Sequence, residues 1–171
     1  MARARKLHLR WEPLPWLFVP LLRPMSTILA AWEGTKYGSG QSCRGALADC
    51  IGFVFGAIDD LDGRPRARSA TMPPDTALHD PETSSEALRA LRALYEPIEV
   101  ISSAYVQPFD IVVVGPSLGG PSHAMLVGPQ KNTLWHATPA SGVHRAGWAL
   151  GDGYEAFHGA FRISDRTRWL K

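Results

Sequence analysis

Two cysteines and a pair of histidines are the residues of this sequence best suited to chemistry. Cys50 opens an apolar run directly after Asp49, a residue type that favours the N-cap of a helix. A thiol in the first turn of a helix feels the positive end of the helix dipole, which stabilises the attacking thiolate. Cys50 is therefore the candidate nucleophile. Cys43 is expected to be a loop thiol.

A nucleophilic thiol needs a base, and the candidates are His123 and His136. His123 lies early in an alternating run, 122–128, and His136 lies near the end of the next β-like run, 133–137. If these runs are antiparallel neighbours, the two imidazoles can approach each other across the strand pair. The pattern predicts Cys50 as nucleophile, His123 as base and His136 as the residue that orients the base.

The same residues admit plainer interpretations. Cys50 could be a small buried hydrophobic residue, and a Cys43–Cys50 disulfide would leave no thiol to react. The histidines could be ordinary strand residues with satisfied hydrogen bonds. A zinc site formed by His123, His136 and His144 is a further alternative, because imidazoles on strands can suit zinc.

The elements that must position these residues fall into two groups along the chain. Helical signals come first, and the second helix is apolar almost all round, which predicts that it is buried. Runs with β-strand character follow, separated by turn residues. Helices are expected at 26–32, 50–60 and 84–95, and strands at 110–114, 122–128, 133–137 and 157–163. This order predicts an α+β fold with an antiparallel sheet.

Several connecting segments have their own character. Residues 34–40 form a glycine-rich loop, and Leu61 to Pro81 forms a long loop of the kind that often binds ligands. Gly52 and Gly56, one helical turn apart, weaken the second helix but allow another backbone to approach it closely.

Composition and charge limit the class of protein. With 171 residues, 45% apolar and 20% charged, the chain has the size and composition of one soluble globular domain. A net charge of +2 argues against a dedicated nucleic-acid binder. Residues 1–24 are a basic, proline-interrupted extension that imitates a signal peptide poorly, so we expect neither a signal peptide nor a membrane span. Met25, where the regular pattern begins, is a candidate start.

Five segments in this order resemble the NlpC-type peptidoglycan cysteine peptidases, which are papain-like. The segments are Trp32–Tyr37 (WEGTKY), Asp49–Val54 (DCIGFV), Gln107–Ile111 (QPFDI), Ser122–Val127 (SHAMLV) and Trp135–Ala137 (WHA). The sequence departs from the family pattern at three positions. Lys36, Ile51 and Phe109 stand where proline, serine and glycine are usual.

The resemblance implies a papain-like domain over 25–171, with N-terminal helices packed on a central antiparallel sheet. It implies a thiol endopeptidase that cuts peptidoglycan stem peptides next to D-glutamate or diaminopimelate and needs no metal or cofactor. The catalytic residues it implies are Cys50, His123, His136 and Tyr37. In this scheme the Tyr37 hydroxyl and the Cys50 backbone N–H hold the oxyanion.

Ile51 after the cysteine, Arg44-Gly45 ahead of it and the lack of a signal peptide resemble the phage-tail and gene-transfer-agent branch of the family. This implies synthesis in the cytoplasm, incorporation into a virion or tail beside tail-tip proteins, and action at the cell wall. Two alternatives stay open. One is a catalytically weak tail-tip or assembly protein that retains the fold, and the other is a papain-like amidase or acyltransferase acting on another substrate.

Overall fold

The computed structural model describes residues 19–63, 89, 91–98, 106–116, 121–130, 132–147 and 156–162. Its helices are α1 (Val19–Trp32) and α2 (Cys50–Asp62). Its strands are β1 (Lys36–Tyr37), β2 (Ser42–Cys43), β3 (Leu47–Ala48), β4 (Glu96–Ile98), β5 (Ile111–Gly115), β6 (His123–Val127), β7 (Thr133–Thr138), β8 (Gly142–Gly147) and β9 (Ala156–Arg162). In this part of the chain no helix is both long and apolar enough to cross a bilayer.

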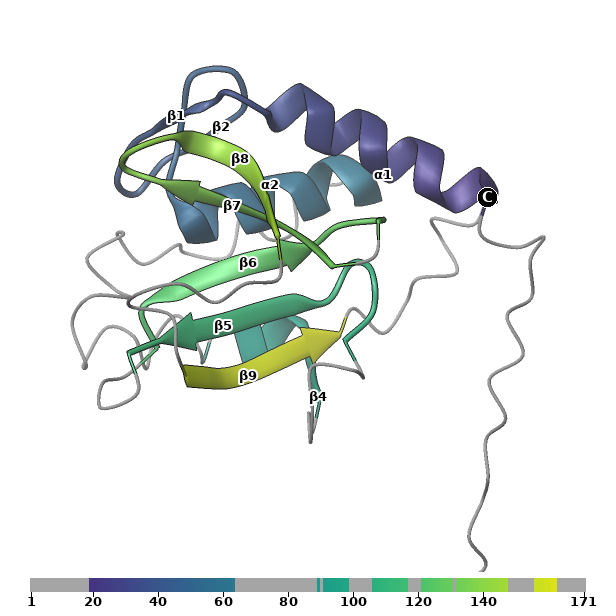
Figure 1. Ribbon diagram of the computed structural model, residues 1–171, viewed down its shortest axis with the longest axis vertical. Coiled ribbons are helices and arrows are strands. Elements are labelled where there is room, and N and C mark those ends of the chain that lie inside the picture. The colour runs from purple at the N-terminus through teal and green to yellow at the C-terminus, as the bar shows by residue number, and fades with distance from the viewer. Residues whose placement is uncertain are drawn as a thin grey trace, which may run out of the picture.

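The strands form two sheets. The larger is antiparallel, with the order β4-β9-β5-β6-β7-β8, and the smaller has the order β1-β3-β2. Helix α2 packs against β6 and β7, and α1 packs against α2. Figure 1 shows the two helices beside the hairpin β7–β8, with β6, β5 and β9 below them. The predicted α+β class with an antiparallel sheet is confirmed.

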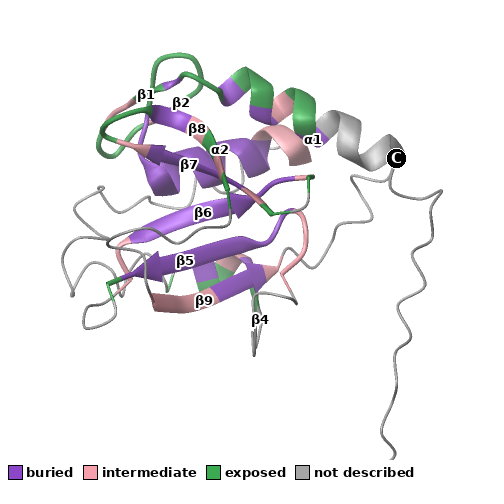
Figure 2. Ribbon diagram, viewed as in Figure 1, coloured by how far each residue is buried: buried purple, intermediate pink, exposed green. Residues whose placement is uncertain are grey.

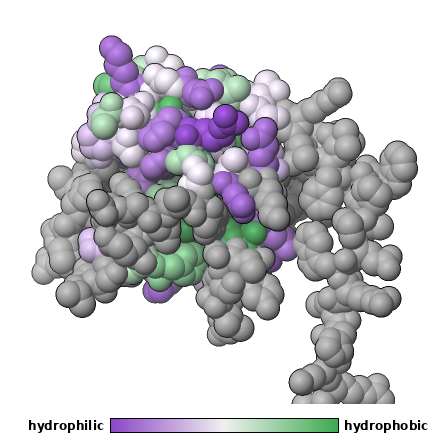
Figure 3. All heavy atoms as spheres, in the orientation of Figure 1, coloured by the Kyte–Doolittle hydropathy of each residue, from purple (hydrophilic) through white to green (hydrophobic). Residues whose placement is uncertain are grey.

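The central helix is buried along most of its length, as its composition predicts. Every residue from Cys50 to Asp59 is buried (Figure 2). Period-two alternation divides β6 between two clusters: Ala124 and Leu126 join the α2 core, and Met125 and Val127 pack in a second cluster across the sheet. On the face drawn in Figure 3, polar residues gather over the hairpin β7–β8 and the smaller sheet.

Some boundaries differ from the sequence prediction. Helix α1 begins at Val19 and not at residue 26 as predicted. Pro20 lies in its first turn, where a missing N–H costs no intrahelical hydrogen bond. Strand β1 interrupts the predicted loop 34–40. The prediction also omitted β2, β3, β4 and β8. Strands β2, β3 and β4 have only two or three residues each, which is too short for a periodic apolar signal. Strand β8 is an edge strand whose one large apolar residue is Val143, so it shows no such signal either.

Two predicted segments fall largely outside the described residues. Of the loop predicted at 61–81, the structure describes the first three positions, where α2 continues to Asp62 and ends at the left-handed cap Gly63. Of the helix predicted at 84–95, residues 89 and 91–94 are helical, and Leu91 is fully buried.

Close backbone approaches fix the smaller sheet against α2 and β8. A Cβ on Gly52 would lie 1.9 Å from the carbonyl oxygen of Gln41, which confirms the predicted role of that glycine. At Gly56 the close neighbour is instead the Trp32 ring, 2.5 Å from such a Cβ. The Val143 N–H donates to the Thr35 carbonyl at 2.8 Å, which joins the smaller sheet to β8.

Phe109 holds a backbone conformation that suits glycine. Its φ is 74°, and its side chain is buried in the α2 core. A side chain in the left-handed region costs about 1–2 kcal/mol relative to glycine. The resemblance places a glycine here, so burial of the phenyl ring offsets backbone strain in this chain.

We expect Phe109→Gly to be more stable than Phe109→Ala by about 1 kcal/mol, although glycine is usually the less stabilising residue. Both variants lose the same buried ring, so their difference isolates the backbone term. Urea denaturation of the two variants measures this difference in the free energy of unfolding. A more stable alanine variant would show that φ at this position is not strained.

Candidate active site

Asp49 caps α2 and holds the preceding loop. One carboxylate oxygen accepts the Gly52 N–H at 2.5 Å, and the other accepts the Gly40 N–H at 2.6 Å. Asp49 is fully buried, and its extended backbone fits the predicted N-cap. Cys50 is therefore the first residue of a buried helix, with its side chain 2% exposed. Neither Cys43 nor Cys50 forms a disulfide, so the disulfide alternative is wrong.

The smaller sheet brings Tyr37 toward the start of α2. Strand β1 runs parallel to β3, with Tyr37 opposite Ala48, two positions before Cys50. The Gly38 N–H donates to the Ala48 carbonyl, and the Asp49 N–H donates to the Gln41 carbonyl. Tyr37 is half-buried against the α2 core. Strands β2 and β3 contact α2, so the smaller sheet of β1, β2 and β3, called the collar below, packs against this helix.

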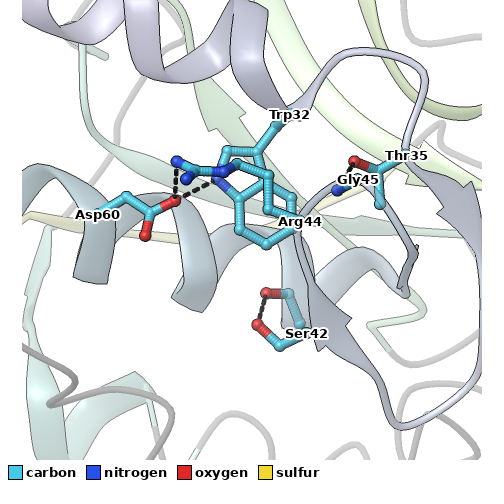
Figure 4. A network of polar contacts seen from close by, with 7 residues as sticks. Trp32, Thr35, Ser42, Arg44, Gly45 and Asp60 are labelled. Atoms are coloured by element: carbon cyan, nitrogen blue, oxygen red, sulfur yellow. Dashed lines mark hydrogen bonds and ion pairs between the residues drawn. The ribbon is translucent and has the colours of Figure 1, made fainter.

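A second polar network holds this collar on the outer face of α2 (Figure 4). The Trp32 indole N–H donates to Asp60 at 2.8 Å, and Arg44 binds the same carboxylate oxygen at 2.9 Å. Asp60 therefore links α1, the loop after β2 and α2. The Ser42 hydroxyl donates to the Gly52 carbonyl at 2.6 Å, which adds a contact in the first turn of the helix.

The two candidate histidines meet across β6 and β7, as their strand positions predict. His123 Nε2 and His136 Nδ1 are 2.8 Å apart, and both side chains are buried. Since Nε2 of His123 is engaged with His136, a proton exchanged with a thiol must pass through Nδ1 of His123. The pair has the geometry of a base and its orienting residue.

The topology gathers the four predicted residues at one end of the molecule. Helix α2 contacts β6 and β7, and β1 contacts β7 and β8. In Figure 1 the start of α2, the start of β6 and the end of β7 all lie at the left of the view. Cys50 and His123 are the first residues of α2 and β6, His136 lies two residues before the end of β7, and Tyr37 belongs to the neighbouring strand β1.

His136 also contacts a histidine that the sequence placed only in a metal alternative. His144 stands opposite it in the β7–β8 register, with ring centroids 4.4 Å apart. Burial, and secondarily the charge of His144, lowers the pKa of His136 from 6.5 to about 4. His136 is therefore neutral near pH 7. Among the described residues, which include His123, His136 and His144, no group of three or more His, Cys, Asp or Glu side chains is arranged to hold a metal ion.

The lowered pKa of His136 predicts acid sensitivity. Between pH 6.5 and about 4 the unfolded chain binds a proton at this residue that the folded chain does not, so stability falls as the pH falls. The expected loss is about 3 kcal/mol. His136→Gln, which keeps a hydrogen-bond acceptor for His123, should lose less over the same interval. Denaturation curves at pH 7 and about pH 4.5 measure this. Equal losses in both proteins would contradict the assignment.

The fold is that of NlpC/P60 domains. NlpC1 from Trichomonas vaginalis matches with a TM-score of 0.54 and 15% identity, over 81% of this chain and 42% of that chain. The NlpC/p60 domain of the peptidoglycan hydrolase SagA matches with a TM-score of 0.53 and 16% identity, over 82% and 97%. An NlpC/P60 family protein from Bacillus cereus matches with a TM-score of 0.51 and 15% identity, over 83% and 40%.

These similarities are structural. The chain spans less than half the length of the Trichomonas and Bacillus structures. No family model and no curated protein matches the sequence. At 14–16% identity the likeness establishes the fold, and the chemistry must be argued from the residues of this chain.

Proposed function

We propose that the chain is a cysteine endopeptidase that hydrolyses amide bonds in peptidoglycan stem peptides. The observation that carries the proposal is the buried His123–His136 hydrogen bond, on the two strands that pack against the helix headed by Cys50. The NlpC/P60 fold supports it, because SagA, one of the matching structures, is itself a peptidoglycan hydrolase.

The proposed reaction begins with proton transfer from the Cys50 thiol to Nδ1 of His123. The thiolate attacks the peptide carbonyl carbon, and the oxyanion takes hydrogen bonds from the Cys50 N–H and the Tyr37 hydroxyl. His123 then protonates the departing amine, leaving a thioester. Water, deprotonated by His123, attacks the thioester and releases the acid and the thiol. Each oxyanion donor contributes about 3 kcal/mol in comparable sites.

His136 orients the base without carrying charge. A lowered pKa keeps it neutral, so its Nδ1 accepts a hydrogen bond from the Nε2–H of His123. That bond fixes the tautomer in which Nδ1 of His123 can take the thiol proton. A neutral partner stabilises the imidazolium less than a carboxylate would.

A phage-tail or prophage setting is part of the proposal, with tail-tip proteins as partners and the cell wall as the place of action. Its support is the resemblance around Arg44-Gly45 and Ile51. A catalytically weak structural protein is the second candidate, favoured by the near-complete burial of Cys50 and by Phe109 at the glycine position.

Digestion of purified muropeptides by the full chain tests the proposal. The expected products, identified by mass spectrometry, are shortened stem peptides on intact glycan. Prior alkylation with iodoacetamide should abolish them, whereas a chelator should leave the rate unchanged. Intact muropeptides after incubation with folded, unmodified protein would contradict the proposal and support the structural alternative.

A further inference from the structure

A third histidine stands beside the pair and has no role in the proposed reaction. His144 faces His136 across β7 and β8, with ring planes inclined at 44°. Its Nδ1 lies 2.9 Å from the Gly142 carbonyl oxygen. A carbonyl only accepts hydrogen bonds, so Nδ1 of His144 carries a hydrogen and donates it. In the neutral form, the lone pair is then on Nε2 of His144.

The proposed reaction also fixes the proton on His136. His123 must donate its Nε2–H to Nδ1 of His136 both before and after it takes the thiol proton. Neutral His136 therefore carries its hydrogen on Nε2. That atom is buried and has no hydrogen-bond partner in the described part of the chain. A buried N–H without an acceptor is unfavourable, so this tautomer is sensitive to the ring that packs beside His136, which is His144.

A positive charge on His144 would destabilise both the His136 tautomer with its hydrogen on Nε2 and the charged form of His123. A cationic His144 ring would repel the Nε2–H of His136, because the hydrogen of that group carries a partial positive charge and the two rings are in contact. A cation at His144 would also lie one ring away from the His123 imidazolium, because neutral His136 contacts both rings. Like charges this close destabilise each other.

We propose that His144 is a positioning residue that permits the Cys50 thiolate–His123 imidazolium pair when neutral and opposes the pair when protonated. The inference rests on the proposed function. The elements packed against β8 are β7, β1 and β3. Their titratable residues are His136, Lys36 and Tyr37, and Arg145 is the other charged residue of β8.

The test is the rate of Cys50 alkylation by iodoacetamide as a function of pH, measured on the full chain. Trypsin cuts after Arg44, so Cys43 and Cys50 fall in separate peptides and Cys43 serves as an internal reference. In the wild-type protein the Cys50 rate should fall on the acid side of neutrality. His144→Phe keeps a ring that cannot be charged, and should raise the rate at about pH 5.5 roughly fivefold.

A permanent charge should have the opposite effect. His144→Lys should lower the Cys50 rate about fivefold or more throughout the neutral range. Arg145→Gln is the matched control, because it changes the charge of the adjacent, exposed residue of β8 and should leave the profile unchanged. Thermal melts check folding, and His144→Gln replaces the phenylalanine variant if that variant is unstable.

The outcomes separate the two proposals. A reactive Cys50 whose pH profile is the same in wild type, the uncharged variants and the lysine variant overturns the role of His144 and leaves the proposed function standing. A Cys50 that is inert at every pH in the wild-type protein contradicts the proposed function itself.

Discussion

Replacing Cys50 by alanine is expected to abolish stem-peptide cleavage, with a loss of at least about three orders of magnitude in rate. No other described cysteine lies in the core, and the exposed Cys43 is outside the proposed chemistry. The loss of one buried sulfur should lower stability by only about 1 kcal/mol. Initial rates of product formation and a thermal melt measure both quantities.

Cys43→Ala is the matched control for the nucleophile, because it removes the other thiol from an exposed position on β2. Its cleavage rate should equal that of the wild-type protein. A Cys50→Ala protein that keeps a tenth of the activity, or a Cys43→Ala protein that loses it, would assign the chemistry to a different residue.

Gly52→Ala is expected to cause a large loss of stability. The new Cβ would lie 1.9 Å from the Gln41 carbonyl oxygen and 3.0 Å from the capping oxygen of Asp49. Both neighbours are held, because Gln41 accepts the Asp49 N–H and Asp49 caps the helix. Neither neighbour can move without breaking contacts in the collar, so we expect the free energy of unfolding to fall by about 3 kcal/mol or more. We expect catalytic activity to be lost as well.

Gly147→Ala is the control for that substitution. A Cβ on Gly147 meets no atom within 4 Å, so the free energy of unfolding of the Gly147→Ala protein should differ from wild type by less than about 0.5 kcal/mol. Urea denaturation of the two variants gives the comparison. A Gly52→Ala protein as stable as Gly147→Ala would mean that the loop around Gln41 is free to shift.

The parts of the site that the sequence predicts are those with local signals. Asp49 before an apolar run predicts the helix cap, and the alternation around His123 and the β-like run around His136 predict two strands. Their meeting needs only one assumption, that consecutive strands pair, and the 2.8 Å contact confirms it. The roles of Cys50, His123, His136 and Tyr37 in catalysis stay predictions.

The missed features depend on tertiary pairing. Strands β1 and β3 have two residues each and exist because they pair with each other, so no periodic signal precedes them. His144 lies on an edge strand, and its contact with His136 follows only from the register of the hairpin. The turn at 139–141, between two runs that each carry a histidine, was the signal that could have found it.

The most direct test of the central claim compares the alkylation rates of the two cysteines in the wild-type protein at about pH 6. Exposure alone favours Cys43, because Cys50 is only 2% exposed. A thiolate paired with His123 at the helix N-terminus should reverse that order, so we predict faster modification of Cys50. Modification of Cys43 alone, with Cys50 left intact, would show that Cys50 is a core thiol and contradict the account.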